Sequence, residues 1–276
     1  MEIALHEPLD GFYRGTRFDR SGVFDSVRFR GVELADRWFE GYDPFRHDTV
    51  CGPAEEFSAI GFDGVKTGCS FLKIGVGLLI RPDEAPYDRF RLYGICDPGK
   101  WESCAEEDKA VFRHILEGCY DYTKEIAVLS EDTVEIRHVL NGLLPETQVE
   151  VYNHNFWTMG HLAVGPQRKI DFPFRPAGHW RADYDSVALS TSGMRFSRAL
   201  EKGESVYMGD THESGAEGMP YAMALGDGPL KVEISGSLPV THTVFWANHR
   251  VACLEPYNRF RTPCSWTVRY RFSAKD

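Results

Sequence analysis

The feature that most constrains the fold is a long series of short segments in which apolar and polar residues alternate. Alternation with a period of two is typical of β-strands that bury one face. The series is clearest in the middle of the chain, where turn-prone residues separate four predicted strands at 111–116, 120–129, 133–140 and 148–158. We expect these four to pair in chain order as an antiparallel meander. No segment carries a convincing long amphipathic helix.

The alternating pattern continues on both sides of this meander. Residues 11–22 followed by 23–30 predict a hairpin, a glycine-containing strand is predicted at 75–80, and the interrupted stretch 38–56 predicts a long loop. Later strands are predicted at 187–190, 195–199, 205–208, 221–225, 230–234, 241–254 and 265–272. A single open sheet with this many strands would curl or split. We therefore predict an all-β protein built as a large antiparallel β-sandwich.

Length and composition favour one domain. The chain has 276 residues, of which 42% are hydrophobic and 13% aromatic, so it can bury a sizeable core. It shows no fixed-period repeat, no low-complexity tract and no linker rich in proline, glycine or serine. We predict a single domain over residues 1–276.

Charge and hydropathy indicate the kind of partner. The formal net charge of −10 opposes binding to nucleic acid or to an anionic membrane, so a neutral small molecule is the better candidate ligand. The start, 1–4, has no basic segment before an apolar core, and the longest aliphatic run, 74–80, is too short to span a bilayer. We expect a cytoplasmic monomer or homodimer.

The cysteines point to a reducing environment. There are seven, an odd number, and none forms a C-x-x-C pair: Cys51, Cys69, Cys96, Cys104, Cys119, Cys253 and Cys264. We expect them to be free thiols, because no disulfide framework is visible.

The strand predicted at 148–158 carries the first candidate site. Alternation places Tyr152, His154 and Phe156 on one face and the neighbouring valines and asparagines on the other. An imidazole between two aromatic rings is typical of a sugar-binding site, since aromatic rings pack on the apolar face of a sugar while the imidazole transfers protons. The alternative is a core histidine that hydrogen-bonds to a backbone carbonyl.

The second candidate site lies near the end of the chain. The apolar strand predicted at 241–254 ends in Glu255, and alternation puts Tyr257 on the same face. An apolar setting would raise the pKa of this carboxyl toward the range of a general base. The alternative is a strand-end glutamate that faces water. Glu55 and Glu56 in the predicted loop could likewise face a ligand or form a solvated loop tip.

These two segments carry a family resemblance. Tyr152-Asn153-His154-Asn155-Phe156-Trp157 resembles the Asn-His-x-Tyr-Phe segment of aldose 1-epimerases (galactose mutarotases), and Leu254-Glu255-Pro256 is similar to their late Glu-Pro segment. The resemblance covers about residues 110–260 and implies a galactose mutarotase-like supersandwich. It implies His154 as the acid and Glu255 as the base of ring opening. No His-Gly-Gly-like segment precedes His154, which favours a second hypothesis, a carbohydrate-binding or sensing protein without turnover.

The resemblance also implies residues that contact the sugar. Arg17 is the candidate for the family's early arginine, with Arg14 as a rival, and Asp210 in Asp210-Thr211-His212 resembles a later Asp-His pair. The remaining candidate substrate-binding residues are Tyr152, Phe156, Glu56 and Tyr257.

Ring opening of a cyclic hemiacetal needs one base for the anomeric hydroxyl and one acid for the ring oxygen, and no metal or other cofactor. A third hypothesis is a metal-dependent sugar isomerase or lyase, because the chain has ten histidines. Six of them are candidate ligands, but their spacing matches no pattern such as H-E-x-x-H: His154, His161, His179, His212, His242 and His249.

Overall fold

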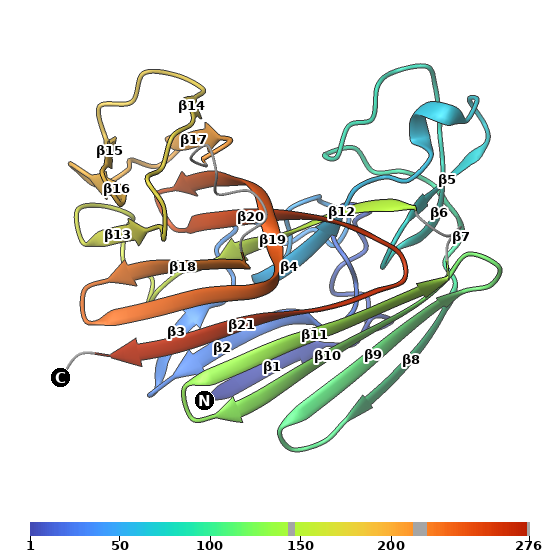
Figure 1. The fold of residues 1–276 in the computed structure, drawn as a ribbon, viewed down its shortest axis with the longest axis horizontal. Helices are drawn as coiled ribbons and strands as arrows, with labels where there is room; N and C mark the ends of the chain where they lie inside the picture. The colour runs from blue at the N-terminus through green and yellow to red at the C-terminus, as the bar shows by residue number, and fades with distance from the viewer. Residues whose placement is uncertain (143–146, 212–219, 275–276) are drawn as a thin grey trace.

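The computed structural model describes residues 1–142, 147–211 and 220–274, and it consists almost entirely of β-strands (Figure 1). Within these residues the only helix is the short 3-10 helix η1 (Phe62–Gly64). The strands before the middle of the chain are β1 (Glu2–His6), β2 (Val23–Phe29), β3 (Val32–Ala35), β4 (Gly52–Phe57), β5 (Ser70–Lys73), β6 (Gly77–Ile80), β7 (Ile95–Asp97), β8 (Lys100–Ala105), β9 (Lys109–Leu116), β10 (Tyr120–Ser130) and β11 (Thr133–Gly142). The later strands are β12 (Gln148–Phe156), β13 (Arg168–Asp171), β14 (His179–Trp180), β15 (Val187–Ser190), β16 (Gly193–Phe196), β17 (Ser205–Gly209), β18 (Pro220–Asp227), β19 (Leu230–Asn248), β20 (Ala252–Arg261) and β21 (Cys264–Ala274). The all-β prediction is confirmed.

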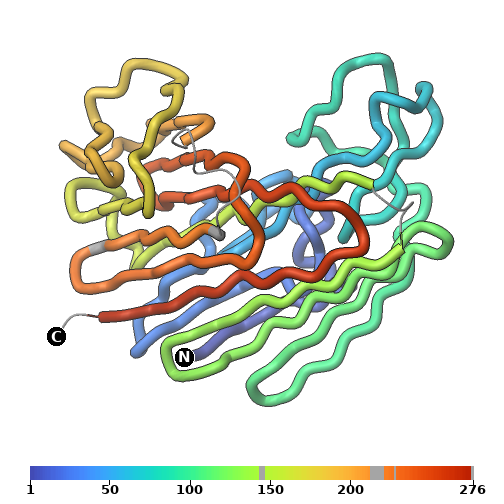
Figure 2. The backbone as a smooth tube through the Cα atoms, in the orientation of Figure 1, coloured from blue at the N-terminus to red at the C-terminus, as the bar shows by residue number. Residues whose placement is uncertain are grey.

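Two extended sheets share one strand. The large sheet has the order β15-β16-β13-β18-β19-β21-β11-β10-β9-β8, and the site sheet has the order β4-β12-β20-β19-β17-β14. All of their strand pairs are antiparallel. Figure 2 shows β21, in red, running between the green meander and the orange β18–β19 hairpin. The predicted large antiparallel sandwich is therefore confirmed.

The core lies between the two sheets and is rich in aromatic rings. Phe57 of β4 packs edge-on against Tyr122 of β10 at 5.4 Å and against Trp266 of β21 at 6.2 Å. Tyr270 of β21 donates a hydrogen bond to Asn155 of β12 at 2.9 Å. Such aromatic pairs contribute roughly 0.5–1.5 kcal/mol beyond the apolar area that they bury. They hold the site sheet at a fixed position on the large sheet.

The shared strand β19 changes sheets along its length. It pairs with β21 as far as Gly236, and from Val240 onward it pairs with β20, with a register shift before His242. A Cβ at Gly236 would lie 2.2 Å from the Tyr221 ring, so this approach of β18 to β19 requires glycine. The strand thereby carries the chain from the large sheet into the site sheet.

The predicted four-stranded meander holds for three strands only. β9, β10 and β11 pair in chain order, but β12 leaves them and lies between β4 and β20. Nearly all of β12 is buried, because one face meets the sandwich core and the other meets the candidate site. Alternation fixes which side chains share a face, but it does not fix the neighbouring strand.

The strand predicted at 241–254 is in fact the end of β19 and the start of β20. Between them the Asn248 side chain accepts the backbone N–H groups of Arg250 (2.8 Å) and Val251 (3.0 Å), which stabilises a tight turn inside an apolar segment. As a result Glu255 lies in the interior of β20 and not at a strand end.

Two expectations for the first sixty residues are wrong. Residues 11–22 contain no strand, and β2 pairs with β1 and β3 instead. The end of the predicted loop 38–56 is β4, whose residues Glu55 and Glu56 are buried and so do not form a solvated tip. Buried cations pair with both carboxylates, and that compensation is invisible to a local pattern.

The remaining expectations concern thiols and the membrane. All seven cysteines are free, as predicted. Among the described residues, no helix has the length and apolar character needed to cross a bilayer.

Candidate functional site

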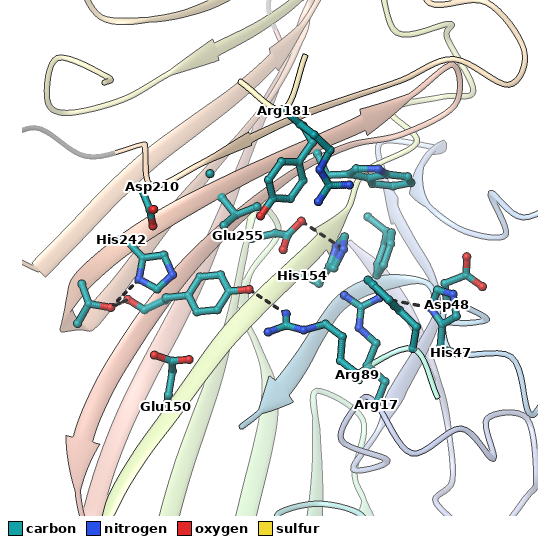
Figure 3. A pocket seen from close by; sticks show the side chains of 18 of the residues that line it. Arg17, His47, Asp48, Arg89, Glu150, His154, Arg181, Asp210, His242 and Glu255 are labelled. Carbon is teal, nitrogen blue, oxygen red and sulfur yellow. Dashed lines mark hydrogen bonds and ion pairs between the residues drawn. The ribbon is translucent and has the colours of Figure 1, made fainter. Parts of the chain in front are cut away.

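A cavity of about 1320 Å³ opens on the face of the site sheet that points away from the large sheet (Figure 3). Its floor comes from β12, β19 and β20, and loop residues such as His47 and Phe90 form part of its wall. The opposite wall includes Arg181 and Tyr207. The lining mixes aromatic rings with charged groups, as expected for a polar ligand with one apolar face.

The aromatic floor follows from the alternation in β12. The His154 and Phe156 rings stack at 3.9 Å with an interplanar angle of 6°, and Trp38 stacks on Phe156 at 5.1 Å. Val149 and Val151 belong to the sandwich core on the opposite face. The predicted facing of the strand is therefore confirmed, and Tyr152, at 6.1 Å, flanks His154 on its other side.

Strand register brings the two candidate catalytic residues together. The pairing of Tyr152 with Tyr257 and of Trp157 with Ala252 sets His154 opposite Glu255 on the adjacent strand. His154 Nε2 lies 3.3 Å from Glu255 Oε1, and the two residues are only 5% and 4% exposed. His154 Nδ1 has no hydrogen-bond partner among the described residues, so the alternative of a core histidine bound to a backbone carbonyl does not hold.

Burial sets the protonation of this pair. It raises the pKa of Glu255 to about 7, although the charges of Arg17 and Arg89 oppose the rise. It lowers the pKa of His154 well below 6.5, and the same two arginines lower it further. In the free protein near neutrality the imidazole is neutral and the carboxyl is partly protonated. The pair thus holds at most one proton, and that proton lies on the carboxyl.

Arg17 is fixed by a buried network behind the cavity. Its Nε lies 2.7 Å from Glu56, its Nη2 lies 2.8 Å from the Tyr152 hydroxyl, and Tyr152 also donates to Glu56. Burial alone would raise the pKa of Glu56, but Lys73, Arg17 and Arg89 lower it to about 2. Arg17 lines the cavity, whereas Glu56 and Tyr152 support it from behind. Their substrate contacts thus remain predictions.

The other predicted ligand contacts lie in different places. Tyr257 lines the cavity and stacks between Tyr152 and His242, at 4.2 Å from each ring. Asp210 is exposed and lines the opposite wall beside His242 (Figure 3), and His212 lies outside the described residues. The rival Arg14 contacts the Phe45 ring and does not line the cavity.

Sequence patterns missed several cavity residues. Arg89 donates hydrogen bonds to the hydroxyls of Tyr152 (3.1 Å) and Tyr257 (3.0 Å), but it lies in a loop with no periodicity or motif. Arg181, which stacks on Tyr207 at 4.0 Å, also lies in irregular chain next to a two-residue strand. The high aromatic content was the only general signal for these walls. Among the described residues, no group of three or more histidine, cysteine, aspartate or glutamate side chains is arranged to hold a metal ion.

Two sheets sharing one strand, with an aromatic cavity over the smaller one, define a large antiparallel β-sandwich of the galactose mutarotase-like class.

No family model and no curated protein matches the sequence. Solved structures do match, and they confirm the resemblance at the level of the fold. A candidate aldose 1-epimerase from Escherichia coli K12 is 9% identical, with a TM-score of 0.55 over 99% of this chain and 100% of that one. A GalM/aldose epimerase homologue from C. elegans is 11% identical, with a TM-score of 0.52 over 100% of both chains. A Synechocystis sp. PCC 6803 protein is 12% identical, with a TM-score of 0.53 over 92% of this chain and 89% of that one.

Proposed function

We propose that this protein binds an aldose in the cavity and interconverts its anomers by acid/base ring opening. The observation that carries the proposal is the buried His154–Glu255 pair, 3.3 Å apart on neighbouring strands at an aromatic floor. A single sugar ring placed there brings its anomeric hydroxyl and its ring oxygen within reach of both groups. The fold that this chain shares with the E. coli and C. elegans structures supports a carbohydrate ligand.

The reaction needs one proton on the pair. One group removes the proton of the anomeric hydroxyl while the other protonates the ring oxygen, so the ring C–O bond breaks and an aldehyde forms. Rotation about the first carbon–carbon bond and reversal of both transfers give the other anomer. Proton number is conserved, and neither oxidant nor reductant is required.

The protonation of the free pair bears on which group plays which role. Family resemblance implies Glu255 as base and His154 as acid, yet in the free protein the proton lies on Glu255 because burial raises its pKa to about 7. The neutral His154 is then ready to accept a proton, and the Glu255 carboxyl is ready to donate one. The two assignments differ by a single proton transfer across 3.3 Å.

A specific observation favours a second candidate, a carbohydrate-binding protein without turnover. The pKa of His154 lies well below 6.5, so in the free protein the imidazole does not hold the proton that the resemblance assigns to it. If Glu255 also fails to supply it, the cavity binds sugar but exchange stays at the rate in buffer.

The test compares exchange and binding in paired variants. We expect His154→Asn and Glu255→Gln each to lower enzyme-catalysed anomer exchange by a factor on the order of 100 or more, because proton transfer contributes that much. Sugar binding, measured by calorimetry, should remain. The matched controls are His161→Asn and Glu102→Gln, whose side chains are 57% and 61% exposed outside the cavity.

Wild-type binding without exchange would establish the binding protein instead. Loss of exchange on treatment with a chelator would favour the metal-dependent hypothesis. Exchange that survives both site substitutions would remove the pair from the mechanism.

A further inference from the structure

A buried cluster of unbalanced charge adjoins the proposed catalytic pair. The Glu56 carboxylate is surrounded by three cationic side chains, with N···O distances of 2.7 Å to Arg17, 3.3 Å to Lys73 and 3.7 Å to Arg89. Glu56, Arg17 and Lys73 are almost fully buried, so water screens their charges poorly. One carboxylate cannot neutralise three cations, and the cluster carries an excess of positive charge.

Two of the cations are already held in place by the buried network. Lys73 donates to Glu56, to the Phe57 carbonyl and to the Tyr87 hydroxyl. Arg17 uses all three guanidinium nitrogens, on Glu56, Tyr152 and His47. These two side chains therefore contribute positive potential, and their geometry is already fixed.

Arg89 is different, because its guanidinium is only partly used. One nitrogen, Nη1, contacts the phenol groups of Tyr152 and Tyr257 and the edge of Glu56, while Nε and Nη2 form no hydrogen bond within the described part of the chain. The side chain is 36% exposed and reaches into the cavity on the same side as Arg17 (Figure 3). A guanidinium fork with free N–H groups matches the paired oxygens of a carboxylate, phosphate or sulfate.

The other acidic groups of the cavity do not cancel this charge. Glu150 is paired with Arg259 at 2.6 Å, and Asp48 is paired with Arg46 at 2.6 Å. Asp88, next to Arg89 in the chain, accepts the backbone N–H of Phe90 and is exposed, so water screens its charge. Asp210 lies on the far wall beside His242 (Figure 3). An anionic group is therefore favoured at Arg89 and disfavoured near Asp210.

We propose that the natural substrate is an aldose that carries an anionic group, a uronate carboxylate or a phosphate or sulfate ester, which binds at the Arg89 fork. This inference rests on the proposed function and names the substrate class of the same site. It departs from the neutral ligand that the net charge of the whole chain suggested. Local potential at the cavity, not the net charge, decides which ligand enters.

The test measures anomer exchange for matched neutral and anionic sugars: glucose and galactose against their uronic acids, 6-phosphates and 6-sulfates. We expect kcat/KM for at least one anionic class to exceed that of its neutral parent by a factor of about 10 or more. Raising the salt concentration from about 0.05 to 0.5 M should reduce that advantage, since the Debye length shortens. Which anionic class leads identifies the acidic group.

Variants of one loop link the advantage to Arg89. Arg89→Gln should lower the ratio of anionic to neutral kcat/KM at least tenfold, mainly through KM, and Arg89→Lys should keep part of the ratio because it keeps the charge but not the fork. Arg91→Gln is the control, because Arg91 lies in the same loop and pairs with Asp83 outside the cavity. It should leave the ratio unchanged, and melting temperatures confirm that each variant folds.

The inference fails if kcat/KM for each neutral sugar equals or exceeds that of all its anionic counterparts. It also fails if the higher kcat/KM of the anionic sugars survives Arg89→Gln. Failure of the proposed function gives a different pattern, in which no sugar is exchanged. In that case calorimetric binding decides: at least tenfold tighter binding of an anionic sugar supports the inference, and equal or absent binding of the anionic sugars overturns it.

Discussion

At the scale of residues, the proton on the His154–Glu255 pair links the geometry to chemistry. Both side chains are removed from water, and burial moves their pKa values in opposite directions, so that a neutral imidazole faces a carboxyl with a pKa of about 7. Two titratable groups whose environments separate their protonation in this way are typical of acid/base sites.

The first prediction is the pH dependence of exchange. Above about pH 7, Glu255 loses its proton and the pair becomes two bases without an acid, so kcat/KM should fall about tenfold per pH unit. As the pH is lowered from 7 to below 6, kcat/KM should stay constant, because the pKa of His154 lies well below 6.5 and the imidazole remains neutral. A pH profile corrected for buffer catalysis measures both limits, and a rate that stays constant up to about pH 9 would contradict a proton held on Glu255.

The second prediction concerns stability. The folded protein raises the pKa of Glu255 from about 4.5 to about 7, so folding retains a proton that the unfolded chain releases, and stability falls as pH rises between these values. The loss should approach about 3 kcal/mol by pH 8. Glu255→Gln should therefore be more stable than the wild type at pH 8 and closer to it at pH 5. Denaturant unfolding at the two pH values measures this, and a difference that does not depend on pH would refute it.

Sequence could predict some residues of the site and not others. His154 and Tyr257 were found because alternation along a strand fixes the face of each side chain. Glu255 was found with the right neighbour but was placed at a strand end, since the turn at 249–251 carries no glycine or proline to mark it. Arg89 could not be found, because its position depends on tyrosines 63 and 168 residues away in the chain.

At the scale of elements, β4 shows how a buried edge strand can look like a loop. Its sequence, Gly-Pro-Ala-Glu-Glu-Phe, has two adjacent carboxylates and no alternation of apolar and polar residues, yet all six residues are buried. Glu56 points to the cation cluster behind the cavity, and Glu55 points to Lys124 of β10 on the core face. The compensating charges come from other strands, which a local pattern does not reveal.

The third prediction tests the importance of that compensation. Lys124→Met should destabilise the fold by roughly 3–5 kcal/mol, because it leaves Glu55 and the neighbouring Asp19 buried without their cation. Lys109→Met on the adjacent strand is the control, since its pair with Glu106 is exposed and contributes well under about 1 kcal/mol. Urea unfolding of the two variants gives the comparison, and similar losses would contradict this account.

At the scale of the whole molecule, β19 joins the two sheets by continuous backbone. Its first half pairs with β18 and β21, and its second half pairs with β17 and β20. Neither sheet can lose this strand without exposing the core of the other. A single domain over residues 1–276 stays a prediction, and this shared strand leads us to expect that the two sheets unfold together.

The fourth prediction is that the chain unfolds in one cooperative transition. Circular dichroism in the far ultraviolet and tryptophan fluorescence should give coincident denaturation curves, because residues on both sheets share one core. Two separated transitions would show that residues 1–276 comprise more than one cooperative unit.

The position of β12 has a consequence during synthesis on the ribosome. Its first partner, β4, is made about a hundred residues before it, and its second partner, β20, is made about a hundred residues after it. Until residues 252–261 leave the exit tunnel, the edge of β12 that β20 will cover has free N–H and C=O groups, which can pair with another nascent chain. The strand that carries His154 thus stays half-paired while about a hundred further residues are made, and the candidate site is completed among the last parts of the molecule.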